Sequence, residues 1–591
     1  MSLSTGFASA VSGLTAVNKQ VEVISNNIAN ATTAGYGRRE LVTTAWSAGG
    51  NGLGVRIVGV SRQADLALQN DRRAAEAADA GTSVQAAALS SIEQAIGTTD
   101  SEVSLQSRIF DFDSSLIEAA SRPDSEARLQ AVVSAARALT EQIGSAARKT
   151  QDLRAGADAT IASTVDSLNS SLARVADLNS QIRGIKAGGK DASALMDQRQ
   201  QLIDKIGKDI PVRVTQREDG SVALFSTGGA VLVDGTASKF GFTQPGFMTA
   251  DLSVENGTLS GLTLNGRPVS TSADSNPLAG GALIAQFTVR DDIGVEAQQQ
   301  LDAVARDLVE RFSASGLDST VATGAAGLFT DAGAAFDPAD ETGLAQRLTL
   351  NPATDPEQGG AVWRIRDGLG AATSGSGGAT DLLLAYSSAL QDQRQPVSGN
   401  FLPGQRSFAA LASDLISGVA SDRLTAESEQ GYAAAKALAL TTQETAAGVD
   451  SDQEMQALLV MEKAYAANAK VISAIGARWS RSATATFPRP CSWQTRPVRQ
   501  NRPSPACRKR SQPASAPIPR ATCPAIWVRS TPLMPVWRAC RPSRPRRTNS
   551  AHWRRRPRPP WARFPIWAIR RNRRFWPAPA PRPRLRSTAA P

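Results

Sequence analysis

The chain has 591 residues, which is room for several domains, and its formal net charge of +11 averages two regions of opposite sign. From Arg478 onward there are 28 of the 65 Lys and Arg residues and no acid, so residues 1–477 carry 37 basic and 54 acidic side chains. All four Cys and the only His lie in this basic tail. Residues 1–477 therefore offer no disulfide, no thiolate nucleophile and no imidazole base or metal ligand. No apolar run of about 18 residues and no secretory signal peptide is visible, so we expect no membrane insertion.

The first 28 residues contain a heptad repeat of apolar side chains. The residues of the repeat are Leu3, Phe7, Ala10, Leu14, Val17, Val21, Ile24 and Ile28. Alternating spacings of three and four predict a helix that presents one seam to another helix. Asn, Thr and Gly residues between 30 and 37 predict a turn after it.

A second seam precedes the basic tail. Asp450 and Asp452 predict a helix start, and the repeat then consists of Leu458, Met461, Tyr465, Asn468, Ile472 and Ile475. The two seams either pair with each other or pack separately, and the spacing alone leaves both open. Asn468 either sets the register at the seam or lies partly exposed beside Tyr465. Glu454, Glu462 and Lys463 are expected to face solvent.

Helical and strand patterns alternate between these ends. Apolar spacing predicts helices over 125–185, 192–206 and 301–312, and helical pattern from 380 to 448 with a break at 396–403. Alternating apolar residues and four turn signals predict antiparallel strands within 210–290; these signals are Asp219-Gly220, Asp234-Gly235, Asn256-Gly257 and Asn265-Gly266.

Three candidate sites have weak signals. Residues 184–190 have the glycine and lysine spacing of a phosphate-binding loop, but a helix precedes them and Asp191 follows, so a helix–helix linker is the favoured interpretation. Asp197 and Asp204 are interpreted as solvated or paired surface charges. The four Cys residues, at 491, 507, 523 and 540, lack the close pairs of a zinc site. No catalytic, cofactor or metal site is predicted.

The tail is interpreted separately. If acids were as frequent in the last 114 residues as in residues 1–477, the tail would contain roughly a dozen of them. It contains none. Our hypothesis is that residues 478–591 are a disordered, out-of-frame product of a frameshift near Ala477 or Arg478. Sequencing the codons for residues 470–490 tests it, and an intact frame without a helix-like alternative would overturn it.

Motifs at the two ends of the acidic region resemble those of the flagellar axial proteins, which comprise rod, hook and hook-associated proteins. The first motif contains Ser12-Gly13-Leu14, then Ser25, Asn26, Asn27, Ile28, Ala29 and Asn30, then Thr33, Gly35, Tyr36 and Arg38. The second contains Gly448-Val449-Asp450, Glu454-Met455, Leu458-Leu459 and residues 463–472. The chain resembles the hook-associated members in particular, because long helices are predicted between its two terminal motifs. Leu195, Asp197, Arg199 and the segment 300–302 also resemble these members.

The predicted fold is an α+β multidomain chain whose terminal helices pair as a coiled coil. Its parts are 1–45 with 446–477 as a terminal axial core domain, 46–209 with 291–313 and 379–445 as a helical domain, 210–290 as a β region, 314–378 as an outer β-rich insertion, and 478–591 as the basic tail. The seams and the motif residues 25–36 are the expected assembly sites.

The resemblance implies a structural subunit, not an enzyme, at the hook–filament junction of a bacterial flagellum. It implies export through the flagellar type III apparatus. The implied partners are hook protein, hook-associated protein 3, further copies in a ring or helical layer, and an export chaperone, without nucleic acid or cofactor.

Two alternatives remain. A hook or distal rod protein would have strands in place of long helices over 70–210. A nucleic-acid binder would act through the basic tail, and unchanged retention on DNA after deletion of 478–591, over a salt series, would exclude it.

Overall fold

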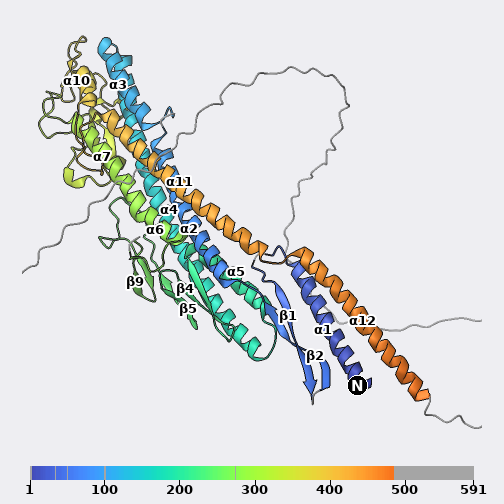
Figure 1. Cartoon of the computed structure of the whole chain (residues 1–591). Helices are drawn as coiled ribbons and strands as arrows, with labels where there is room; N and C mark the ends of the chain where they lie inside the picture. Colours follow the sequence, from blue (N-terminus) through green and yellow to red (C-terminus); the bar gives the residue numbers. More distant parts are fainter. Residues whose placement is uncertain (1–2, 34, 49–50, 99–100, 273–274, 485–591) are drawn as a thin grey trace, which may run out of the picture. The chain divides into compact units, whose positions relative to one another are not determined.

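The computed structural model describes residues 3–33, 35–48, 51–98, 101–272 and 275–484, which belong to one compact unit (Figure 1). The helices are α1 (Leu3–Ala29), α2 (Leu66–Ile96), α3 (Leu105–Ser121), α4 (Glu126–Ala187), α5 (Ser193–Asp209), α6 (Ala282–Thr288), α7 (Gly294–Phe312), α8 (Leu344–Arg347), α9 (Arg364–Asp367), α10 (Asp381–Gln391), α11 (Phe408–Ala446) and α12 (Ser451–Thr484). The strands are β1 (Arg39–Ala48), β2 (Asn51–Arg62), β3 (Val212–Gln216), β4 (Val222–Ser226), β5 (Val231–Asp234), β6 (Thr236–Ala237), β7 (Phe240–Gly241), β8 (Leu262–Leu264), β9 (Arg267–Val269), β10 (Phe329–Asp331) and β11 (Leu348–Leu350).

The helix α4 is 62 residues long and confirms the helix predicted over 125–185. It contains no proline, so no backbone donor is lost along it. It ends at Ala187 with Gly188 as its C-cap, and Gly189 adopts φ +67°, which turns the chain toward α5. The segment 184–190 is therefore the end of one helix and the turn to the next, as the linker interpretation predicted.

The sheets are small and antiparallel. One contains β3 to β6 in chain order and another contains β7 to β9. In the hairpin β8–β9 both turn residues have positive φ, 52° at Asn265 and 77° at Gly266, as the Asn-Gly pair predicted. The β region ends earlier than 290, because α6 begins at Ala282 and continues through a π-helical turn (Val289–Ile293) into α7.

Two hydrophobic cores hold these elements together. The first core joins α3, α7, α10, the start of α11 and the α4 residues from Leu129 to Ala147. The second core joins α5, α6, the sheets of β3 to β8 and the α4 residues from Ile161 to Val175. Both cores are thus built along the same helix.

Two regions differ from the sequence-based expectation. Residues 39–62 form a long hairpin, β1–β2, that the sequence analysis did not predict. Residues 314–378 are not β-rich, because their described strands are the three-residue pair β10 and β11 among short helical turns. Leu328, Phe329 and Ile365 from this segment are buried in the first core, so it contributes to the body of the protein.

Candidate functional site

The helices α1 and α12 pack side by side, and the hairpin β1–β2 also packs against α1 (Figure 1). Two α1 glycines allow the close approach of α12. A Cβ added at Gly6 would lie 3.5 Å from Cδ1 of Ile475, and one at Gly13 would lie 3.2 Å from both amide atoms of Asn468. On the hairpin side, Val55 N–H donates to Ser12 Oγ at 3.1 Å. The terminal segments therefore pair with each other.

The predicted seams are only partly covered by this pairing. In α1, Ile24 is buried, Leu14, Val17, Val21 and Ile28 are partly buried, and Leu3 and Phe7 are exposed. In α12, Leu458, Met461, Asn468, Ile472 and Ile475 are partly buried and Tyr465 is exposed. The helix α12 passes through Arg478 to Thr484, and the rest of the predicted tail lies outside the described residues.

Asn27 is the buried centre of the N-terminal motif, with 1% of its surface exposed. Its Oδ1 accepts hydrogen bonds from Tyr36 Oη–H at 2.9 Å and from the Arg39 backbone N–H at 3.0 Å. Its Nδ2 donates to the Arg39 carbonyl at 2.9 Å. One side chain thus ties the end of α1 to the start of β1.

The other motif residues surround this centre. Ser25, Asn26 and Ala29 are exposed, and Ile28 and Asn30 are partly buried. Gly35 adopts φ +77°, and a Cβ there would lie 2.9 Å from Cγ of Gln201 on α5. Gly35 is therefore required both by the turn and by the approach of α5.

A buried carboxylate fixes the hairpin to α5. Asp197 accepts from Arg39 Nη2 at 2.7 Å, from Arg62 Nε at 2.9 Å and from the Gly37 N–H at 3.3 Å. The interpretation of Asp197 as a surface charge is wrong, although it is paired. Burial raises the pKa of Tyr36 beside it, Arg39 opposes this shift, and the Asp197 carboxylate adds to it.

A second buried carboxylate joins the motif to α12. Glu454 is 2% exposed and accepts from Arg38 Nε at 2.8 Å. The expectation that Glu454 faces solvent is therefore wrong, whereas Glu462 and Lys463 are exposed as predicted. Asp450 Oδ1 accepts from the backbone N–H groups of Asp452 and Gln453, which confirms the predicted start of α12.

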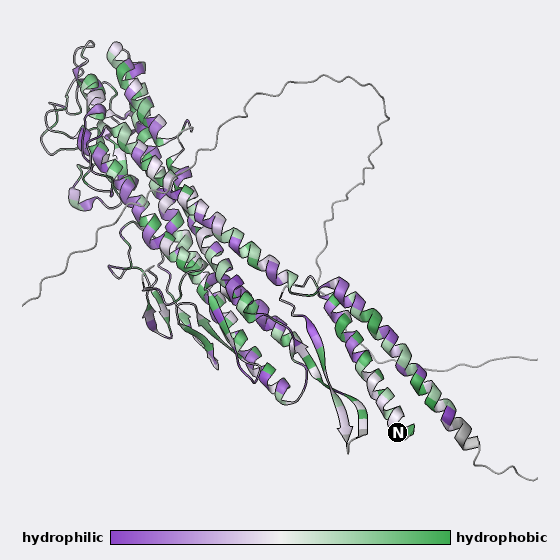
Figure 2. Cartoon of the chain, in the orientation of Figure 1, coloured by the Kyte–Doolittle hydropathy of each residue, from purple (hydrophilic) through white to green (hydrophobic). Residues whose placement is uncertain are grey.

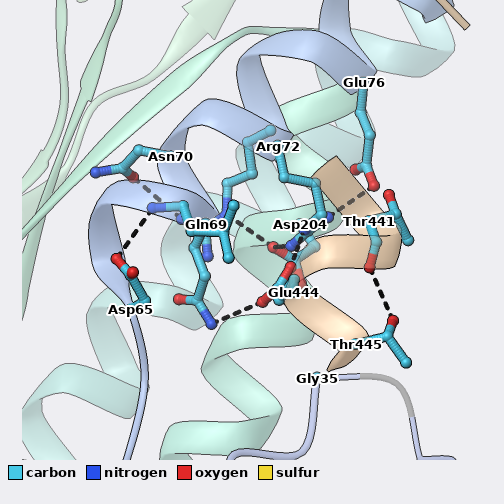
Figure 3. Close-up of polar contacts among 12 residues, drawn as sticks. Gly35, Asp65, Gln69, Asn70, Arg72, Glu76, Asp204, Thr441, Glu444 and Thr445 are labelled. Atoms are coloured by element: carbon cyan, nitrogen blue, oxygen red, sulfur yellow. Dashed lines mark hydrogen bonds and ion pairs between the residues drawn. The ribbon is translucent and has the colours of Figure 1, made fainter. Parts of the chain in front are cut away.

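A third polar cluster lies near the end of α11 and is drawn in Figure 3. Arg72 on α2 bonds the carboxylates of Glu444 on α11, Asp204 on α5 at 2.9 Å and Glu76 at 2.7 Å. Gln69 Nε2 also donates to Glu444, at 2.9 Å. Burial would lower the pKa of Arg72, but the three carboxylates outweigh it and raise the pKa. The cluster holds three helices together at Glu444, two residues before α11 ends at Ala446.

Sequence reasoning missed these ion-paired residues, although helical spacing contained a signal for two of them. Asp197 shares the face of Gln200, Ile203 and Ile206, which are buried on α5. Glu454 precedes Leu458 by four residues, which is a seam spacing. The partners of these carboxylates are too distant in the chain for any local pattern to show.

The described residues contain no cluster of His, Cys, Asp and Glu that could hold a metal ion. None of the described helices is both long enough and apolar enough to cross a membrane. Over residues 70–210, the described elements are helices, as expected for a hook-associated protein and not for a hook or rod protein.

Two family models match the chain. The model described as "Flagella basal body rod protein" matches residues 7–36, which contain α1 and the Asn27 motif. The model described as "Flagellar hook-associated protein FlgK helical domain" matches residues 89–329.

Similar proteins carry one name. The chain is 29% identical over 244 residues to flagellar hook-associated protein 1 of Escherichia coli, covering 40% of this chain and 44% of that protein. The proteins of the same name from Salmonella typhimurium and Bacillus subtilis are 30% and 28% identical over 39% of this chain, which is 42% and 47% of their own lengths. The matches thus span less than half of these relatives.

A solved structure, that of the flagellar hook junction protein FlgK from Burkholderia pseudomallei, is also similar. It has 21% identity and a TM-score of 0.36, over 44% of this chain and 46% of that one.

The helix α1 with its motif, and the long helices that follow it in the chain, are the features of a flagellar axial protein. Within that class, the helical-domain match and the named relatives agree, and the chain is similar to hook-associated protein 1 (FlgK) over the matched residues. The prediction of a structural protein rather than an enzyme is confirmed by these homologues, which are flagellar structural proteins.

Proposed function

We propose that the chain is a structural subunit of the bacterial flagellum at the hook–filament junction and that it assembles through α1 and α12. The observation that carries this proposal is the set of apolar side chains that these helices leave exposed. Figure 2 shows hydrophobic residues along both helices. The exposed residues that precede the basic tail are Leu3, Phe7 and Val11 on α1 and Met455, Leu459, Val460, Tyr465 and Val471 on α12.

Single exposed apolar residues are common on soluble proteins, but eight on one helix pair need an explanation. Each apolar Å² removed from water contributes about 25 cal/mol, so covering these side chains would favour association. Neighbouring copies that offer the same helix pair could cover them. In this proposal the terminal helices form a coiled coil in the assembled state, with the seams and the motif residues as assembly sites.

The family name supports the location, and the remaining parts of the proposal follow from it. The partners would be hook protein, hook-associated protein 3, further copies in a ring or helical layer, and an export chaperone, with export through the flagellar type III apparatus. Residues 1–45 with 446–477 would form the axial core domain. The hairpin β1–β2 crosses the boundary at 45 and would connect that domain to the helical one.

A charge placed on the exposed apolar surface tests the assembly mode. Val460 is 58% exposed, so Val460→Asp should leave the fold and export intact and prevent stable incorporation. In a flagellated host that lacks its own copy, we expect the variant in the medium and its amount in purified flagella reduced at least about tenfold, since roughly 1.4 kcal/mol of lost contact suffices. Immunoblots of both fractions measure this.

The matched control is Gln456→Asp, which places the same charge at an exposed polar position of α12. It should incorporate like the wild type. Normal incorporation of Val460→Asp would contradict assembly through this surface, and absence of the wild-type chain from purified flagella would contradict the proposed location.

A further inference from the structure

A cavity of about 570 Å³ lies between the hairpin β1–β2, the turn from α4 to α5, the helix α5 and the strands β3 and β4. Its volume is within the range of about 300–1,000 Å³ that is usual for ligand sites. Six lining residues are cationic and one is acidic; the cations are Lys19, Arg62, Lys186, Lys190, Arg199 and Arg217, and the acid is Asp191. A cavity with this charge balance in a body rich in acids favours an anion.

Arg199 is the buried cation of the cavity wall, with 5% of its surface exposed. Its Nη1 donates to Asn179 Oδ1 at 2.8 Å and to the Gly220 carbonyl at 2.9 Å, so both acceptors are neutral. Its Nε and Nη2 have no acceptor among the described residues. Because Arg199 lines the cavity, we infer that these nitrogens are the donors that it offers to a ligand there.

Another buried arginine shows what a purely structural role looks like in this protein. Arg154 also lacks a carboxylate partner among the described residues, but its Nε, Nη1 and Nη2 all donate to carbonyl groups, at 2.7–3.2 Å. Arg199 uses one nitrogen where Arg154 uses three. Burial, with the nearby Arg62 guanidinium, lowers the pKa of Arg199 to about 10, so the site holds a charge that an anion would stabilise.

Two exposed lysines lie at the mouth of the cavity because of the turn between α4 and α5. The Lys190 N–H donates to the Ile185 carbonyl at 3.1 Å, and this bond closes the turn between Lys186 and Lys190. A Cβ added at Gly220 would lie 2.9 Å from Lys186 Nζ, and the Gly220 carbonyl accepts from Arg199. Lys186 and Arg199 thus meet at the same residue.

The acids near the cavity offset these three cations only in part, and Asp219 opposes the lowering of the Arg199 pKa. Among the described residues, no carboxylate forms an ion pair with Lys186, Lys190 or Arg199. Asp191 Oδ1 accepts from the N–H and the hydroxyl of Ser193, and Asp219 Oδ1 is held in the same way by Ser221. The other three cations are already paired: Lys19 with Glu22, Arg62 with Asp197 and Arg217 with Asp234.

We propose that this cavity binds an oxyanion, a phosphate or carboxylate group, between the guanidinium of Arg199 and the ammonium groups of Lys186 and Lys190. Arg199 offers two directed N–H donors from the wall, and the lysines supply charge at the opening. The spacing of residues 184–190 that resembled a phosphate-binding loop acquires a role here through its lysines. The backbone does not form such a loop, because a helix precedes it.

The test compares the melting temperature of the full chain with and without anions. The probes are 20 mM inorganic phosphate and 20 mM citrate, each against NaCl of equal ionic strength at pH 7. Lys186→Gln/Lys190→Gln changes exposed side chains and should leave the fold intact, whereas Arg199→Gln also removes two structural hydrogen bonds. Lys208→Gln is the control, an exposed lysine of α5 that does not line the cavity.

Phosphate and citrate stabilise any protein by strengthening the burial of its apolar surface. The 28 basic residues from Arg478 onward also attract these anions. The readout is therefore the difference between the variants in the rise of the melting temperature. At least one probe should raise the melting temperature of the wild type and of Lys208→Gln by about 3 °C more than it raises that of Lys186→Gln/Lys190→Gln. A gain with phosphate alone identifies a phosphate ligand, and a gain with citrate identifies a carboxylate ligand. Equal gains in all three proteins with both probes would overturn the proposal.

Discussion

Asn27 gives the clearest test of the motif at the scale of one residue. Removing its amide would leave the Arg39 N–H and carbonyl and the Tyr36 hydroxyl without their partner. Asn27→Ala should therefore cost about 2 kcal/mol, the usual penalty for orphaned buried polar groups. Chemical unfolding of the purified chain measures this cost, and amide exchange at Arg39 locates it.

The neighbouring Asn26 is the control, since it is exposed and lies on the same helix. Asn26→Ala should change the free energy of unfolding by less than about 0.5 kcal/mol. Equal effects of the two substitutions would mean that Asn27 does not hold β1 to α1.

Asp302 predicts a pH dependence. It is 3% exposed and accepts from the N–H groups of Gly343 and Ala345, both at 2.8 Å, and from Gln298 Nε2 at 2.9 Å. Burial raises the pKa of Asp302 to about 6, and these three donors only partly oppose the shift. The folded state therefore binds the proton more tightly than the unfolded state, whose pKa is near 3.8.

The sign of the effect follows from this linkage. The stabilisation from Asp302 is fully present below about pH 4 and is lost as the pH rises through 6, a change of about 3 kcal/mol. The melting temperature of the wild type relative to Asp302→Asn should fall between pH 4 and 7. Glu462→Gln, at an exposed position, should show no such trend, and a constant difference for Asp302→Asn would contradict the assignment.

At the scale of elements, we expect the contact between Arg72 and Glu444 to hold the end of α11 against α2. Arg72 links α2, α5 and α11 (Figure 3), so its loss leaves three carboxylates without a common partner. A double-mutant cycle with Arg72→Ala and Glu444→Ala should give a coupling energy of about 1–2 kcal/mol. Chemical unfolding of the four proteins measures it.

The exposed pair Lys19 and Glu22 on α1 is the matched control. Its cycle should give about 0.5 kcal/mol or less, since both side chains remain solvated. A coupling between Arg72 and Glu444 that is no larger would show that other contacts fix the end of α11.

The sequence predicted the long helices of the whole molecule because their signal is local and repeated. Residues 129–143 and 168–182 show the apolar period over many turns, and α4 contains both. The hairpin β1–β2 was missed, although the Gly and Asn residues at 49–52 are a turn signal in the sequence, because the flanking helices dominated the pattern. The segment 314–378 was misjudged because its Gly-rich composition indicated a surface, while its few large apolar residues enter the first core.

The polar contacts of the candidate site could not be predicted from the sequence. Arg38 and Glu454 are 416 residues apart in the chain, and Arg72 and Glu444 are 372 apart. The packing of α12 beside α1 brings the first pair within reach, and the packing of α11 on α2 brings the second. The seams indicated that such pairing was possible, but the side chains that fix it lie beside the seams.

The helix α4 has a mechanical consequence. At 1.5 Å per residue its 62 residues extend about 90 Å, and different stretches of it belong to the two cores. No flexible linker separates the cores along this path. A twist applied to one core is therefore transmitted to the other through the backbone hydrogen bonds of a continuous helix, and the two respond to torsional load as one stiff body.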